Sequence, residues 1–328
     1  MAARRTAVVT DSTAQLDAAT VERLGVVVVP LQVVIGDEVY DEDTDAGSAE
    51  RITEALRGRT AVSTSRPGPA VLEELYARLT AEGYDEILSV HLSGAVSGTY
   101  ESALLAARTV DIPIRTVDTR QVGPATGYAV ESAVARLREG ATLDAAAKAA
   151  RDRAAAAESL FYVDSLEYLR RGGRVGAAAA LVGGVLAVKP ILTIANGTVA
   201  SKEKVRTASK ALARLEALAV EATGEQQVEI GVAHLANPDA AGTLTEALTA
   251  RLAHQLGGRE VRCSELSAVL GGPRRPRHRR RLRGAAPGLT RVEVEETRGW
   301  PARRPQLADP AAPSPGGLRS PAGDAVRS

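Results

Sequence analysis

Short apolar runs alternate with long helical segments through the first half of the chain. The runs at residues 6–10, 86–92 and 114–117 are each followed by polar residues and then by a segment with helical spacing of its apolar side chains. Two strands separated by such a helix pair through a crossover, which is nearly always right-handed and makes the strands parallel. The pattern therefore predicts an α/β fold with a mainly parallel sheet covered by helices.

Hydroxyl and carboxyl side chains follow these three runs at equivalent positions. They are Asp11 and Ser12, residues 93–99, and Asp118 and Thr119. The carboxyl ends of parallel strands lie at one edge of a sheet, so we expect these groups to gather there, joined by a loop that carries Thr64 and Ser65. Neutral donors at helix N-termini suit a carboxylate or a phosphate. Taken singly, each residue is better explained as a helix N-cap, but their repetition favours a binding site.

A basic turn and an uncharged run follow. Residues 168–176 place three arginines around Gly172 and Gly173, and residues 177–188 carry no charge. This run is too short and too rich in alanine and glycine to span a bilayer, which needs ~20 apolar residues. We expect a buried helix whose small residues admit another backbone or a long, thin apolar ligand. A plain core helix after a glycine C-cap fits the spacing even better.

The pattern changes again beyond this run. The expected elements are a hairpin around Asn196 and Gly197, helices at 209–221 and 238–256, and strands at 229–234 and 260–266. We therefore expect an N-terminal α/β domain at residues 1–159 and an α+β domain at 160–271. Residues 272–328 are dominated by arginine, proline, alanine and glycine, and they are predicted to be a disordered tail.

Charge and cysteine content exclude some kinds of binding and catalytic site. The chain has 41 basic and 40 acidic residues, but thirteen arginines and only five acidic residues lie at 272–328, so residues 1–271 carry a formal charge of about −7. That charge argues against a nucleic-acid surface on the folded part. A single cysteine, Cys263, excludes an internal disulfide and a cysteine-based zinc or redox site. With no signal-peptide pattern at its start, the chain is expected to be cytoplasmic.

Seven short motifs, in order and spacing, resemble the DegV family. They are Thr10-Asp11-Ser12, Thr64-Ser65-Arg66-Pro67, His91-Leu92-Ser93 with Ser97-Gly98-Thr99-Tyr100, Asp118-Thr119, residues 169–174, Lys189-Pro190-Ile191, and residues 203–207. The resemblance covers residues 6–270 and implies a bacterial fatty-acid-binding protein of two α/β domains. In that family the bound acid is passed to a separate ATP-dependent kinase, which makes an acyl phosphate for phospholipid synthesis.

The resemblance also implies roles for particular residues. Thr64 and Ser97 match the expected carboxylate ligands, with Ser65 and Ser93 nearby. Four arginines match positions expected to face the kinase, although a solvated turn or structural ion pairs would explain them equally well: Arg170, Arg171, Arg174 and Arg206. The implied partners are a long-chain fatty acid and the kinase, with transient contact at a membrane surface left open. No catalytic residue, metal or cofactor is implied, and no nucleic acid is expected.

The chain departs from the family pattern at the loops and at the C-terminus. Gly94 stands where a serine is usual and Arg66 where a glutamine is usual, and Gly68 is also unusual. Beyond Gly271 an arginine-rich sequence replaces the family's histidine-containing glycine segment and its last apolar strand. Reading the arginine codons one base later would restore that segment, so we interpret the departure as a frameshift or sequencing error near residue 271. Its loss would leave a sheet with an unpaired edge and remove one polar contact to the head group.

Two other function classes remain open from the sequence. A hydrolase or phosphotransferase would use Asp11, Ser12 and Ser97, but no Gly-x-Ser-x-Gly elbow is present. His91 and His234 lie within strands and have no evident acid partner. A nucleic-acid-binding function would rest on the arginine-rich tail and would be sensitive to salt.

Overall fold

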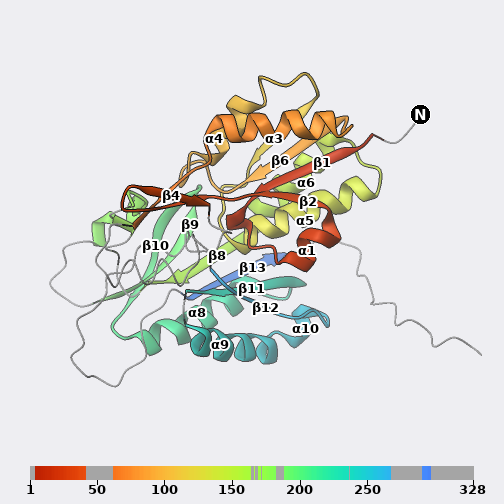
Figure 1. The fold of residues 1–328 in the computed structure, drawn as a ribbon. Coiled ribbons are helices and arrows are strands. Elements are labelled where there is room, and N and C mark those ends of the chain that lie inside the picture. The colour runs from red at the N-terminus through yellow and green to blue at the C-terminus, as the bar shows by residue number, and fades with distance from the viewer. Residues whose placement is uncertain are drawn as a thin grey trace, which may run out of the picture. The chain divides into compact units, whose positions relative to one another are not determined.

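In a computed structural model of the chain, the described residues are 4–41, 62–163, 166, 169–170, 172–181, 188–235, 237–266 and 290–296. They belong to one compact unit, Met1–Thr297. Three sheets and the helices packed on them make up this unit (Figure 1). No helix within these ranges combines the length and the apolar character that crossing a membrane requires.

The first sheet is parallel, with strand order β2-β1-β6-β7. Its strands are β1 Thr6–Asp11, β2 Val26–Val29, β6 Glu86–His91 and β7 Ile114–Asp118. Its helices are η1 Ser12–Ala14, α1 Ala18–Leu24, α3 Pro69–Ala81, α4 Thr99–Ala106, α5 Pro124–Arg138 and α6 Leu143–Ala155. Thr10 pairs with Val90, and His91 pairs with Asp118, so three strands end at one edge. The predicted α/β fold is confirmed.

Alternate residues of these strands face two different cores. Val8 and Leu88 pack with the alanine-rich helices α5 and α6, whereas Val9 and Ile87 pack with α3 and α4 (Figure 1). Successive side chains of a strand point to opposite faces. Residues two or four positions along the strand from Val9 and Ile87 therefore also face α3 and α4. They include the polar residues Asp11 on β1 and Ser89 and His91 on β6.

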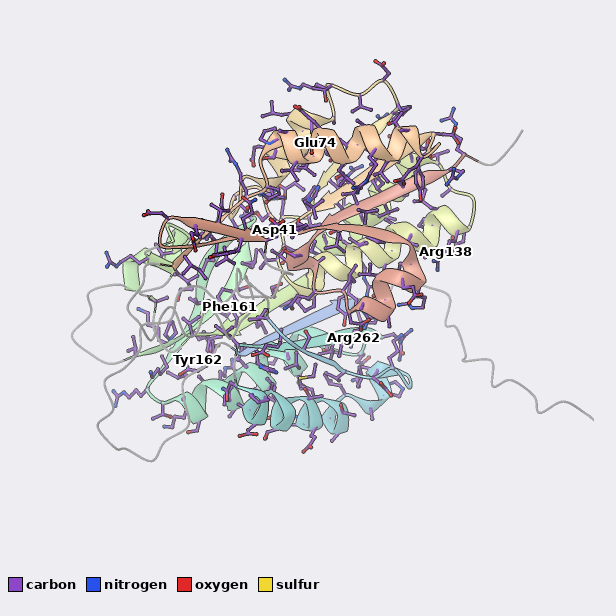
Figure 2. All side chains as sticks on the ribbon, in the orientation of Figure 1. Asp41, Glu74, Arg138, Phe161, Tyr162 and Arg262 are labelled. Atoms are coloured by element: carbon purple, nitrogen blue, oxygen red, sulfur yellow. The ribbon has the colours of Figure 1, made fainter. Side chains whose placement is uncertain are left out.

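The second sheet has six strands in the order β10-β9-β8-β13-β11-β12. The strands are β8 Ala157–Tyr162, β9 Lys189–Ala195, β10 Thr198–Val205, β11 Val228–His234, β12 Arg262–Glu265 and β13 Thr290–Glu296. Helices α8 Ala208–Thr223, α9 Pro238–Arg251 and α10 Ala253–Leu256 belong to the same half. Tyr162 packs in the core with α8, whereas its neighbour Phe161 packs with Leu192 and Val199 (Figure 2).

The predicted hairpin joins β9 and β10. Asn196 and Gly197 form its turn with φ values of 53° and 81°, the left-handed geometry that a two-residue hairpin turn of this type needs. The parallel sheet lies entirely before residue 159, and the six-stranded sheet begins at Ala157. The proposed division into domains at 159/160 falls within β8, so it lies close to the change of sheet without coinciding with it, and it stays a prediction.

Strand β13 corrects the prediction of a disordered tail. Thr290–Glu296 pairs antiparallel with β8 on one side and with β11 on the other, so disorder throughout residues 272–328 is wrong for this segment. Its sequence alternates β-branched and charged residues, a strand pattern that the composition of the whole tail conceals. The expected unpaired edge is also wrong here, because β13 lies between β8 and β11. The interpretation of a shifted frame near residue 271 falls outside the described residues.

Two further segments differ from expectation. The predicted hydroxyl loop begins as a strand, β5 Val62–Ser65, which pairs with β3 Gln32–Ile35 in a small sheet completed by β4 Glu38–Asp41. The uncharged run begins as a short 3-10 helix, η3 Gly176–Leu181, with Gly176 and Ala177 exposed. The expected buried helix is thus wrong at its start, and residues 182–187 lie outside the described part. A Cβ on Gly176 would stand 2.4 Å from the carbonyl oxygen of Val199, so the small residue does admit another backbone.

Candidate functional site

The segment between β6 and α4 carries the hydroxyl groups that the sequence predicts for the site. Ser97 is 8% exposed, and its Oγ lies 2.9 Å from Oγ1 of the fully buried Thr99. One hydroxyl of this pair donates to the other, which leaves one O–H as a donor for a ligand. The N-cap of α4 is Gly98, and Ser97 Oγ accepts only a long bond of 3.4 Å from the N–H of Thr99. Helix capping therefore does not account for Ser97.

Arg174 connects this segment to β5. Its Nε donates to the carbonyl oxygen of Val96 at 3.0 Å, and its Nη1 donates to Oγ1 of Thr64 at 3.1 Å. Thr64 accepts in this bond, so its own O–H is left to donate. Thr64 and the residue preceding Ser97 are thus held by one guanidinium. That Arg174 faces a partner protein stays a prediction; in the structure its guanidinium contacts Thr64 and Val96.

The electrostatics of Arg174 point to an anion. Burial lowers the pKa of the Arg174 guanidinium below its usual value. In the described ranges no carboxylate lies within ion-pair distance of it; its hydrogen bonds go to a hydroxyl and a carbonyl. A half-buried cation is costly unless it is paired and hydrogen-bonded. A carboxylate at this position would offset that cost and accept charge-assisted hydrogen bonds.

The other two predicted hydroxyls are differently engaged. Oγ of the fully buried Ser93 donates to the carbonyl oxygen of Gly197 at 2.7 Å, in the turn between β9 and β10. Arg120 supports the same turn, since its Nη2 donates to the carbonyl oxygen of Asn196 at 2.9 Å. Ser65 is half-buried and donates to the carbonyl oxygen of Arg66 at 3.3 Å. The structure thus connects Thr64, Arg174 and the segment bearing Ser97, and it bonds Ser93 to the hairpin turn at Gly197.

A fully buried polar network, missed by the sequence analysis, lies beneath this segment. Nδ1 of His91 is 2.9 Å from Oδ2 of Asp11, and Nε2 is 2.7 Å from Oγ of Ser89. The hydroxyl of Tyr76 donates to the same Oγ at 2.7 Å. The expectation that His91 lacks an acid partner is therefore wrong. The carboxylate places the ring proton on Nδ1, so Nε2 accepts from Ser89 and every member of the chain is paired.

The hydrogen bonds of this network run from aspartate to histidine to serine, as in the catalytic triad of a hydrolase. Its serine, however, is not an accessible nucleophile. Ser89 lies inside β6 between β1 and β7, with no exposed surface, and Tyr76 already bonds its oxygen. Burial raises the pKa of Tyr76 to about 12, so the phenol stays a donor. Of the serines considered for a hydrolase, Ser12 accepts from the N–H of Leu31, and Ser97 pairs with Thr99. The geometry does not favour a hydrolase.

The network instead fixes the loops at the strand ends. Oδ2 of Asp11 accepts from the N–H of Leu92 at 3.1 Å, and Oδ1 accepts from the N–H of Thr13 at 3.2 Å. On the other side of β6, at the end of β7, Oδ1 of Asp118 accepts from the N–H groups of Gly94 at 3.2 Å and Arg120 at 2.8 Å. The two carboxylates thereby fix the backbone at both ends of residues 92–94, which lead to Ser97 and Thr99.

For the other three arginines, contact with a partner protein also stays a prediction. Arg170 and Arg206 are both exposed. Arg171 lies outside the described residues. The described part of the chain contains no group of three or more histidine, cysteine or acidic side chains arranged to hold a metal ion.

Known proteins resemble this chain over the part that contains the residues described above. A family model described as an uncharacterised protein of the DegV family matches residues 5–272. A DegV domain-containing protein of Streptomyces coelicolor is 46% identical over 268 residues, which is 82% of this chain and 94% of that protein. Two solved structures align with a TM-score of 0.76 over 89% of this chain. One is a Thermus thermophilus DegV family protein described by its fatty acid binding, 30% identical over 99% of its chain. The other is Bacillus subtilis DegV, described as a fatty acid binding protein, 29% identical over 100% of its chain.

Proposed function

The chain belongs to the DegV family, and on this premise we propose that it binds a long-chain fatty acid through Thr64, Ser97 and Arg174. The single observation that carries the proposal is Arg174, a half-buried guanidinium that bonds Thr64 and Val96 without a carboxylate partner in the described ranges. The two solved relatives described as fatty-acid-binding support the choice of ligand.

The head group and the acyl chain contribute differently to such binding. A hydrogen bond to a charged group contributes about 1.5–3 kcal/mol, and Thr64, Ser97 and Arg174 each supply a donor. Burying the acyl chain contributes about 0.8 kcal/mol per methylene, so the chain provides most of the affinity. The acyl chain is proposed to lie in a buried tunnel of the protein. The carboxylate contacts then fix which end of the ligand reaches the hydroxyl segment.

The bound carboxylate is proposed to be presented to a separate, ATP-dependent fatty acid kinase. This chain supplies no catalytic residue in the proposal: it acts as the substrate-presenting subunit, and the acyl phosphate product serves phospholipid synthesis in the cytoplasm. The exposed Arg170 and Arg206 suit contact with the kinase, as does Arg171 by its position in the sequence. Transient contact with a membrane surface would deliver or remove the acid.

The head-group assignment is tested by removing two hydroxyls. In a delipidated Thr64→Ala/Ser97→Ala variant, we expect the affinity for a long-chain fatty acid to fall by about 100-fold or more, because two donors to a charged group are lost. A matched control, Ser209→Ala/Thr249→Ala, removes two hydroxyls on exposed surfaces of α8 and α9 and should bind like the unaltered protein. Equal affinity of all three proteins would contradict the assignment.

A further inference from the structure

Arg66 reaches the same short segment as Arg174. Its guanidinium packs so closely on Gly98 that a Cβ added there would stand 1.7 Å from Nη1 and 2.6 Å from Cζ. Arg66 is the first residue after β5, two positions beyond Thr64. The two arginines therefore contact residues 96–98 from different parts of the chain, Arg174 at Val96 and Arg66 at Gly98, with Ser97 between the two contacts.

Neither guanidinium is neutralised by the described residues. Ion pairs formed by other arginines are numerous, such as Arg115 with Asp144 and Arg262 with Glu131, but none within the described ranges involves Arg66 or Arg174. Gly98 is also the N-cap of α4, whose first backbone N–H groups add partial positive charge. Arg66 is exposed and Arg174 is half-buried, and two cations that contact the same short segment favour an anion bound beside it.

We propose that Arg66 is a specificity-determining residue of the head-group site. Together with Arg174 it selects ligands with an ionised head group and disfavours uncharged acyl compounds of the same chain length, such as the alcohol and the methyl ester. This inference rests on the proposed fatty-acid binding. It assigns to Arg66 a contact that the hydroxyls alone would not provide, because hydroxyls bond charged and neutral oxygens alike, whereas a guanidinium favours an anion.

Gly98 offers a way to move Arg66 without changing the charge of the protein. The φ of Gly98 is −76°, a value open to any residue, so alanine would not strain the backbone. Its methyl group would, however, occupy the space of the Arg66 guanidinium. Gly98→Ala should therefore displace the arginine head from the segment while all charges are kept.

The test measures the affinities of three ligands of equal chain length: a long-chain fatty acid, its alcohol and its methyl ester. The full chain is delipidated and compared with Arg66→Gln, Arg66→Lys and Gly98→Ala. Arg108→Gln is the control, because it removes an exposed arginine beyond the other end of α4. Arg66→Gln should bind the acid about tenfold more weakly, as expected for one charge-assisted bond, and bind the alcohol and the ester unchanged. Gly98→Ala should show the same selective loss, Arg66→Lys a smaller one, and Arg108→Gln none.

Two results would overturn the inference while leaving fatty-acid binding intact. One is an unchanged acid affinity in Arg66→Gln, and the other is an equal loss for all three ligands, which would mean that Arg66 only supports the packing of the segment. A delipidated parent protein that binds none of the three ligands would instead refute the proposed function, and the inference with it.

Discussion

At the scale of single residues, the substitution Ser93→Ala tests whether this serine binds the ligand or stabilises the fold. Its hydroxyl donates to the carbonyl oxygen of Gly197, so Ser93→Ala should lower the free energy of unfolding by about 1 kcal/mol through the lost hydrogen bond. Fatty-acid affinity should change little, because that donor is already used. Thr198→Ala is the control: it removes an exposed hydroxyl–carbonyl bond from the same hairpin. If Ser93→Ala weakens binding as strongly as loss of Thr64 and Ser97, then Ser93 is a carboxylate ligand.

Tyr76 gives the buried network a measurable pH dependence. Burial raises its pKa to about 12 in the folded protein, against an ordinary value near 10. The folded state therefore holds the phenol proton more tightly, and the associated stability is present below about pH 10 and is lost as the pH rises towards 12. Tyr76→Phe should remove this dependence, which amounts to at most about 1.4 kcal/mol per unit of pKa difference. Urea unfolding between about pH 8 and 11.5 would show parallel curves for both proteins if Tyr76 does not titrate in this way.

Sequence reasoning finds the residue types of the site more readily than their partners. Thr64 and Ser97 are identified by the motifs they belong to, and the structure connects their segments. The bonds that organise them join residues 80 positions apart for His91 and Asp11, 104 for Ser93 and Gly197, and 110 for Arg174 and Thr64. A residue's type does not specify a partner at that distance along the chain. For this reason the sequence reveals neither the contact of Arg174 with Thr64 nor the carboxylate partner of His91.

At the scale of elements, we predict that the stability of the second sheet depends on β13. Deleting residues 290–328 removes a strand from between β8 and β11, so we expect a lower melting temperature and aggregation through the exposed edges. The control deletes residues 298–328 only and should melt like the full chain, because Met1–Thr297 forms the compact unit.

Hydrogen exchange tests the same strand in the intact chain. Backbone amides of Thr290–Glu296 should exchange slowly, since the strand pairs on both sides. Fast exchange throughout this segment, or equal melting temperatures of the two truncated proteins, would remove β13 from the sheet.

Elements were predictable where local pattern and tertiary environment agree. The parallel strands are apolar because both faces are buried, and Pro69 occupies the first turn of α3 as its sequence position suggests. The failures are segments whose structure depends on distant pairing. β5 forms because β3 lies beside it, and β13 forms because β8 and β11 leave a place between them. The local sequence of β13 has a strand pattern, but in neither case does local sequence specify the strands that pair with it.

For the whole molecule, the fold joins the segment between β6 and α4 to contacts from the second half of the chain. Arg174 and the turn at Gly197 contact the segment between β6 and α4. Arg262 on β12, labelled in Figure 2, donates to Glu131 on α5 at 2.6 and 2.9 Å. Residues 1–271 carry a formal charge of about −7, so an anionic ligand depends on local cations rather than on the overall field. The proposed function therefore centres on Arg174.

The most direct measurement is mass spectrometry of the purified full chain, with Arg174→Gln prepared in parallel. Intact-complex spectra and solvent extracts should show one long-chain fatty acid per protein chain for the parent, with the acid chemically unmodified. Occupancy in Arg174→Gln should be clearly lower, because the head group loses its counterion. A parent protein that contains no fatty acid and takes up none after delipidation would contradict fatty-acid binding. An Arg174→Gln variant that holds the acid as fully as the parent would contradict the role of Arg174 in the site.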